Sequence, residues 1–149
     1  RRRASAAGGN QVFAAEPEQA GLRRVDLAVI SGDEATMTLL THGIELEGYR
    51  TRSIRSGLTA ARALAGPERS LQARVVLIDA DLPRFDSLQL IEQLASEGVL
   101  QQTAVIVLSS ASRGQEAAQA LELGAADLIA KPVDLPALLD RVKQELGSV

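Results

Sequence analysis

Short apolar runs recur along the chain at regular intervals. The clearest are 27–30, 75–78 and 104–108, and weaker runs lie at 49–54 and 127–130. A continuous run of Val, Leu and Ile is typical of a strand buried on both faces, as the strands of parallel sheets are. These five runs therefore predict five strands.

An amphipathic stretch follows each run, with apolar residues at the spacing of one helix face. Several of these stretches end at a glycine, a common residue just beyond a helix. The positions that define the helices are Leu39, Leu40 and Ile44; Leu58, Ala61, Leu64 and Ala65; Leu88, Leu90, Ile91 and Leu94; Ala117, Ala118, Ala120, Leu121 and Leu123; and Leu135, Leu138, Leu139, Val142 and Leu146. This alternation predicts an α/β fold, a doubly wound (βα)5 parallel sheet with strand order 2-1-3-4-5.

Polar residues stand where the predicted strands end. Asp79 ends the third strand, because Pro83 and its polar neighbours cannot extend it. Ser109 follows the fourth strand, Lys131 follows the fifth, and residues 31–33 follow the first. In open α/β sheets, ligands bind outside the carboxyl ends of the strands. We therefore expect these residues to gather at one site.

Composition narrows the class of function. The chain has 149 residues, of which 46% are hydrophobic, and this predicts one folded domain. It has no Cys and a single His (His42). Zinc centres and Ser-His-Asp triads need these residue types, so neither is expected here. The lack of Cys fits a reducing compartment, and we expect a cytoplasmic protein. No apolar stretch approaches the roughly 20 residues that span a membrane.

Charge divides the chain unevenly. Residues 1–24 hold five Arg and two Glu, and the remainder holds 11 basic and 17 acidic residues. The first segment has no sustained periodicity, so we expect 1–24 to be a flexible basic leader and 25–149 to be the folded domain. A mildly acidic domain with 2% aromatic residues is not expected to bind nucleic acid directly.

Three segments carry a family resemblance. Residues 76–87 read VLIDADLPRFDS, residues 105–110 read VIVLSS, and residues 123–132 read LGAADLIAKP. Together, in this order and spacing, they resemble the receiver domain of response regulators, the CheY-like family with a flavodoxin-like fold. The first is similar to the family's phosphoacceptor loop, Asp-x-x-Leu-Pro-x-x-Asp-Gly, with Ser87 in place of the glycine.

The resemblance implies a role for each residue at the strand ends. Asp79 would accept a phosphoryl group, and Ser109 would hydrogen-bond that group through its hydroxyl. Lys131 would pair with a phosphate oxygen, and the bond between Lys131 and Pro132 would be cis. The family also uses Mg²⁺, which needs oxygen ligands, so Asp79 would be one of the metal ligands.

The chain departs from the family pattern at the metal site. The family has two adjacent acids after the first strand, and Ser31 and Gly32 stand at those positions. Asp33 lies one residue later and Glu34 two residues later. Leu128 also replaces an aromatic switch residue of the family. We therefore expect weak Mg²⁺ binding and an atypical pseudo-receiver with little or no phosphorylation.

Two other functions remain open at this point. In the first, the domain is a working phosphoreceiver in which Asp33 or Glu34 completes the metal site with Asp79. The second is a nucleotide-binding enzyme on the same architecture, but the chain has no Gly-x-Gly-x-x-Gly loop after a strand and no Walker-type motif.

The expected partners are proteins. We predict a regulatory domain rather than an enzyme, which contacts a histidine kinase or an output domain fused upstream of Arg1. A homodimer through the fourth and fifth helices is also expected, because Leu123, Leu135 and Leu139 would leave apolar area on that side.

Overall fold

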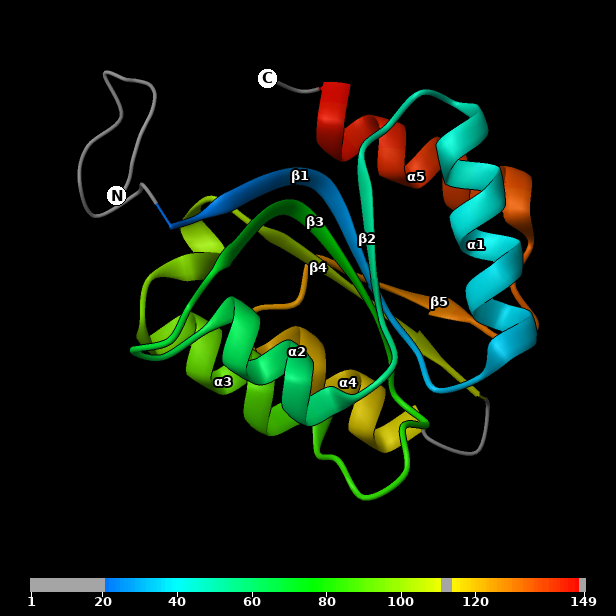
Figure 1. The fold of residues 1–149 in the computed structure, drawn as a ribbon. Helices are drawn as coiled ribbons and strands as arrows, with labels where there is room; N and C mark the ends of the chain where they lie inside the picture. The colour runs from blue at the N-terminus through cyan, green and yellow to red at the C-terminus, as the bar shows by residue number, and fades with distance from the viewer. Residues whose placement is uncertain (1–20, 111–113, 148–149) are drawn as a thin grey trace.

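The computed structural model describes residues 21–110 and 114–147. Strands and helices alternate through this part of the chain (Figure 1). In chain order the elements are β1 (Arg23–Ile30), α1 (Glu34–Leu46), β2 (Thr51–Ile54), α2 (Gly57–Leu64), β3 (Leu71–Asp79), α3 (Ser87–Ser96), the 3₁₀ turn η2 (Val99–Gln101), β4 (Ala104–Ser109), α4 (Gly114–Leu123), β5 (Asp127–Ala130) and α5 (Leu135–Gly147).

The five strands form one parallel sheet in the order β2-β1-β3-β4-β5, which confirms the predicted topology. In register, Leu27 of β1 lies between Thr51 of β2 and Val75 of β3. Val75 in turn pairs with Ala104 of β4. The three central strands have neighbours on both sides, and their Val, Leu and Ile side chains are buried except for Val25, which is half-buried.

Helices cover both faces of the sheet (Figure 1). α1 and α5 lie on one face, and α2, α3 and α4 lie on the other. Each face has its own apolar cluster, because successive strand residues point to opposite sides. Ile30, Val76 and Ile78 pack toward α2 and α3. Leu27 and Leu77 pack toward α1 and α5. Each fully buried Leu or Ile contributes about 1.5–3 kcal/mol of hydrophobic free energy.

The strand boundaries differ slightly from the sequence prediction. β1 begins at Arg23, four residues before the predicted run at 27–30, because Arg23 pairs with Leu71 at the start of β3. β2 begins at Thr51 rather than Tyr49. Residues 1–20 lie outside the described residues, so a flexible leader there stays a prediction. Arg23 and Arg24, which were assigned to that leader, belong to the sheet.

Two helix residues expected on apolar faces are exposed. Leu39 of α1 is 46% exposed and Leu58 of α2 is 59% exposed, whereas Leu40 and Ile44 are fully buried. Leu39 and Leu40 are adjacent, so on a helix with 3.6 residues per turn their side chains point about 100° apart, and here only Leu40 faces the sheet. The prediction that Leu39 shares the face of Leu40 and Ile44 is therefore wrong.

Local signals at the helix ends agree with the sequence. Asp86 caps α3, since its carboxylate accepts hydrogen bonds from the N–H groups of Leu88 and Gln89. Gly124 follows α4 with a φ of 124°, a conformation that side chains rarely tolerate. Among the described residues, no helix is both long and apolar enough to cross a membrane.

Candidate functional site

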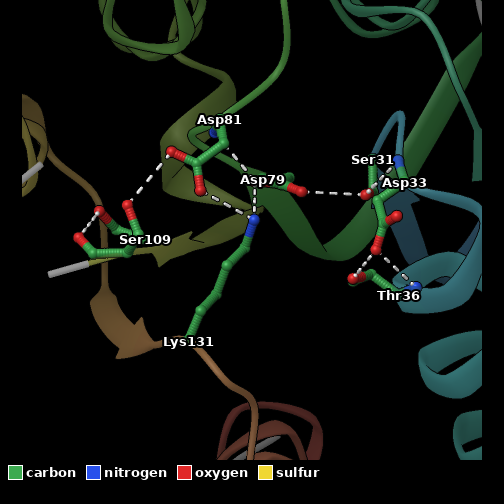
Figure 2. A network of polar contacts seen from close by, with 8 residues as sticks. Ser31, Asp33, Thr36, Asp79, Asp81, Ser109 and Lys131 are labelled. Carbon is green, nitrogen blue, oxygen red and sulfur yellow. Dashed lines mark hydrogen bonds and ion pairs between the residues drawn. The ribbon is translucent and has the colours of Figure 1, made fainter. Parts of the chain in front are cut away.

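Four segments meet at the carboxyl edge of the sheet. Figure 2 shows Ser31 after β1, Asp79 at the end of β3, Ser109 at the end of β4 and Lys131 after β5. The parallel order of the strands brings these ends to one edge, as the pattern of strand ends predicted.

Asp79 lies at the centre of this site. Its side chain is buried, with 3% of the residue exposed. One carboxylate oxygen, Oδ2, accepts a hydrogen bond of 3.0 Å from the Ser31 hydroxyl. The other, Oδ1, accepts from the Asp81 backbone N–H at 2.9 Å and from Lys131 Nζ at 2.5 Å. Both oxygens of this buried carboxylate therefore have donors from the protein itself.

Lys131 bridges two carboxylates. Its ammonium group contacts Asp79 and also lies 2.9 Å from Oδ2 of Asp81 (Figure 2). Burial works to lower the pKa of Lys131, but the hydrogen bonds and charges of Asp79 and Asp81 outweigh it and raise that pKa. The bond from Lys131 to Pro132 is cis, as expected. The ammonium group is thus held charged between the two acids.

Ser109 has a different orientation. It is buried at the end of β4, and its hydroxyl donates to the carbonyl oxygen of the next residue, Ser110, at 3.2 Å. The hydroxyl of Ser110 lies 3.5 Å from Asp81 Oδ1. Ser109 is therefore at the site, but its hydroxyl is engaged by the neighbouring backbone rather than by Asp79.

The turn after β1 contributes a hydroxyl and no inward-pointing carboxylate. Ser31 is fully buried and donates to Asp79, while Gly32 has no side chain. Asp33 is the N-cap of α1, and its carboxylate accepts hydrogen bonds from the N–H and the hydroxyl of Thr36. These bonds lower the pKa of Asp33. Figure 2 shows Asp33 and Thr36 turned toward one another.

Glu34 is also engaged away from Asp79. Its carboxylate forms an ion pair of 2.5 Å with Arg55, on the exposed surface at the end of β2. Among residues 21–110 and 114–147, no three His, Cys, Asp or Glu residues cluster closely enough to hold a metal ion. The donor set around Asp79 consists of a hydroxyl, an amide and an ammonium group, and this set does not suit Mg²⁺, which prefers oxygen ligands and carboxylates.

Sequence reasoning missed Asp81 as part of the site. Its backbone N–H donates to Asp79, and its carboxylate accepts from Lys131. A signal was present: the N–H two residues after an Asp commonly bonds back to that side chain in a turn. Such a turn carries the second carboxylate to the strand end.

Leu128 and Ser87 also depart from the family pattern. Leu128 is half-buried against the core cluster on the α2–α4 face. Ser87 begins α3, and its hydroxyl oxygen is buried without a hydrogen-bond partner among the described residues.

Comparison with known proteins assigns this chain to one family. The family model for the response regulator receiver domain matches residues 27–143. The chain therefore belongs to the receiver-domain family of two-component response regulators.

Similar curated proteins are longer than this chain. The phosphate regulon transcriptional regulatory protein PhoB of Rhizobium meliloti is 29% identical over 80% of the chain and 51% of its own length. The response regulator protein PmrA of Pseudomonas aeruginosa is 32% identical over 68% of the chain and 43% of its own length. The chain thus spans about half the length of these relatives.

Solved structures show the same fold. A CheY-like receiver domain protein from Methanospirillum hungatei superposes with a TM-score of 0.72 at 20% identity, over 85% of this chain and 95% of that one. The receiver domain of the Francisella response regulator 1452 gives 0.70 at 22% identity, over 83% and 98%. This likeness shows the doubly wound receiver architecture.

Proposed function

We propose that this domain is an atypical receiver, a regulatory interaction module whose state does not depend on Mg²⁺-driven phosphorylation. It would act as a binding domain rather than as an enzyme. Its partner would be a histidine kinase or an output domain of the same protein. Asp79 would serve mainly to hold the strand ends together.

The observation that supports this proposal is the set of donors on Asp79. Ser31, the Asp81 N–H and Lys131 together supply hydrogen bonds to both carboxylate oxygens. Phosphoryl transfer depends on positioning and on neutralising charge around the transferred group. A carboxylate whose two oxygens already accept from a hydroxyl, an amide and an ammonium group is a weak nucleophile.

The two acids that could complete a metal site are already engaged. Asp33 caps α1 and Glu34 pairs with Arg55. Turning Asp33 toward Asp79 would leave first-turn N–H groups of α1 without their acceptor. The alternative is a working phosphoreceiver, in which Asp33 or Glu34 leaves its present partner and binds the metal. The test must distinguish the two.

The test is the intact mass after incubation with acetyl phosphate, with and without Mg²⁺, on the parent and on Asp79→Asn. We expect no added phosphate in either protein. A single phosphate that requires both Mg²⁺ and Asp79 would overturn the proposal and establish the phosphoreceiver.

We also propose a homodimer through α4 and α5, as the sequence indicated. Leu121 of α4 is 45% exposed, while Leu123, Leu135 and Leu139 are half-buried. Sedimentation of the parent and of Leu121→Glu tests it. A monomeric parent at high concentration would exclude the dimer.

A further inference from the structure

A positively charged groove lies beside β2, on the face of the sheet that α2 covers. Its cavity volume is about 760 Å³. Arg23 of β1, Arg52 of β2 and Arg55 after β2 line it, with hydroxyl groups from Ser56 and Thr59 among its other polar residues. No Asp or Glu stands among the described residues of this lining. Its charged groups are therefore all cations.

These arginines have few acidic neighbours. Within the described part of the chain, Arg23 and Arg52 are exposed and have no carboxylate within ion-pair distance. Arg55 pairs with Glu34, and both side chains of that pair are about two-thirds exposed. Residues 48–67 hold four Arg and no acid, in a chain with a net charge of −3. The positive charge is thus concentrated at this edge of the molecule and attracts anionic groups.

The groove adjoins an open strand edge. β2 is the outermost strand, with β1 on its inner side. The carbonyl oxygen of Arg50 accepts a hydrogen bond of 3.0 Å from the N–H of Leu27 in β1, and that of Ile54 accepts one of 3.1 Å from the N–H of Ser31, just after β1. Backbone groups of alternate residues point to opposite edges of a strand. The N–H and C=O groups of the intervening residues, 51 and 53, therefore point away from the sheet, where another strand can pair with them.

We propose that the edge of β2 and the adjoining groove bind an acidic protein segment in extended conformation. Its backbone pairs with Thr51 and Ser53, and its carboxylates contact Arg23, Arg52 and Arg55. Guanidinium groups suit carboxylates because two N–H donors match two oxygens. The three arginines come from β1, from β2 and from the turn after β2, which favours several separated charges over one compact anion. This proposal does not depend on phosphorylation of Asp79.

The arginine on this edge strand could have a purely protective role, and that role makes a different prediction. Charged residues on an edge strand also protect it from pairing with other chains. If Arg52 has only this protective role, no extended peptide binds in a defined register. The amides of Thr51 and Ser53 then keep the same exchange rate whatever peptide is added.

The first experiment uses the full chain and a peptide of about eight residues that alternates Glu and Val, which places its acids on one face when extended. Two matched peptides serve as controls, one with the same composition in a Glu block and a Val block, and one that alternates Lys and Val. We expect only the alternating acidic peptide to slow hydrogen exchange at the amides of Thr51 and Ser53. Equal binding of the block peptide, or no slowing at these amides, would overturn the proposal.

Variants then separate charge from strand pairing. Arg23→Gln with Arg52→Gln should weaken peptide binding about tenfold, since two exposed ion pairs are lost. Arg62→Gln, on α2 outside the groove lining, should leave it unchanged.

Ser53→Pro removes an outward N–H without touching the bonds to β1, so it should abolish binding, whereas Ser53→Ala should retain it. Circular dichroism confirms that each variant folds. If Ser53→Pro folds and still binds, strand addition is wrong. If Ser53→Pro does not fold, the exchange rates of the parent amides decide the question alone.

Discussion

The two sides of the carboxyl-end site use their charged residues differently. On the β3–β5 side, Asp79 and Asp81 face Lys131, and the three groups form one network. On the β1–α1 side, a neutral hydroxyl from Ser31 enters the site, and the carboxylate of Asp33 turns away to cap a helix. One side keeps its charges at the centre, and the other replaces charge with a single hydroxyl.

The difference shows that the direction of a side chain decides whether it joins the site, even when its residue is close in sequence to one that does. Asp33 is only two residues from Ser31, yet its carboxylate is hydrogen-bonded to Thr36 within the first turn of α1. An N-cap side chain folds back over the helix that it begins. An acid at that position stabilises α1 and is withdrawn from the site.

The largest expected effect, on Mg²⁺ binding and phosphorylation, comes from placing carboxylates on the β1–α1 side of the site. Gly32→Asp, alone and combined with Ser31→Asp, should create Mg²⁺ binding at least about tenfold tighter than in the parent and allow Mg²⁺-dependent labelling by acetyl phosphate. A Cβ at residue 32 would meet its nearest atom, Leu82 Cδ2, at 3.5 Å, an ordinary contact. Mg²⁺ titration by calorimetry and intact mass measure the two effects.

Two controls sharpen this experiment. Asp79→Asn in the doubly substituted background should abolish the labelling, and Gly147→Asp, where a Cβ meets open space at the end of α5, should gain nothing. If the double variant folds but neither binds Mg²⁺ nor accepts phosphate, the missing acids are not what separates this domain from a phosphoreceiver.

The next largest effect, on the free energy of unfolding, is expected on the β3–β5 side of the site. Lys131→Met leaves the carboxylates of Asp79 and Asp81 facing one another without their shared cation, and should lower the free energy of unfolding by about 1–3 kcal/mol. The value is discounted because the Lys131 side chain is 21% exposed. Urea unfolding measures it. Adding Asp81→Asn should recover part of the loss, which a double-mutant cycle quantifies.

The same contact predicts a pH dependence. The folded-state pKa of Lys131 is raised above the ordinary 10.5 by Asp79 and Asp81. A raised lysine pKa means that the stabilisation is complete below pH 10.5 and is lost as the pH rises through the folded-state value. The parent should therefore lose stability in this alkaline range more steeply than Lys131→Met. Equal slopes would show that the contact adds no pH-dependent stability.

A smaller loss of stability is expected when the Ser31 hydroxyl, on the β1–α1 side of the site, is removed. Ser31→Ala removes the donor to Asp79 Oδ2 and should cost about 1.5–2 kcal/mol, since hydrogen bonds to buried charged groups are the stronger ones. Ser87→Ala is the matched control, because the Ser87 hydroxyl oxygen is buried without a partner in the described structure. Urea unfolding of both variants should show a loss only at Ser31. Equal losses would mean that cavity formation, rather than the hydrogen bond, accounts for the change.

Much of the fold could be predicted from the sequence. Continuous apolar runs such as 75–78 and 104–108 are strong signals, because a parallel strand must be apolar on both faces. The end of such a run also placed Asp79 at the carboxyl edge. The exposed side of a helix was harder to predict. Leu39 and Leu58 carry apolar side chains outward, and nothing in the local spacing distinguishes them from Leu40.

The contacts within the site depend on the directions of side chains, and the spacing of residues along the sequence does not give these directions. Lys131 reaches Asp79 because β5 is placed beside β4, which the topology predicts. The partners of Asp81 and Ser109 depend on turn geometry after the strands, where one backbone angle redirects a side chain. Arg84, in the turn after β3, has a φ of 56°, which no residue pattern indicated.

The smallest expected effect tests Asp33 itself. Asp33→Ala removes the cap of α1 and should lower the melting temperature, less than Ser31→Ala does, whereas Asp33→Asn retains an acceptor oxygen and should come close to the parent. The lowered pKa of Asp33 means that its charge stabilises the fold above pH 3.8, and this contribution is lost as the pH falls through the folded-state value. Thermal melts across this acid range should therefore show a shallower loss for Asp33→Asn.

Neither substitution should change the response to Mg²⁺, in the parent or in the variant with both new carboxylates. A carboxylate engaged by the N–H and the hydroxyl of Thr36 has no oxygen directed at Asp79. If Asp33→Ala removed an Mg²⁺ response that the parent possessed, Asp33 would have to leave the helix end and enter the site. The two sides of the site would then be alike in function, and the phosphoreceiver would replace the interaction module as the better description of this domain.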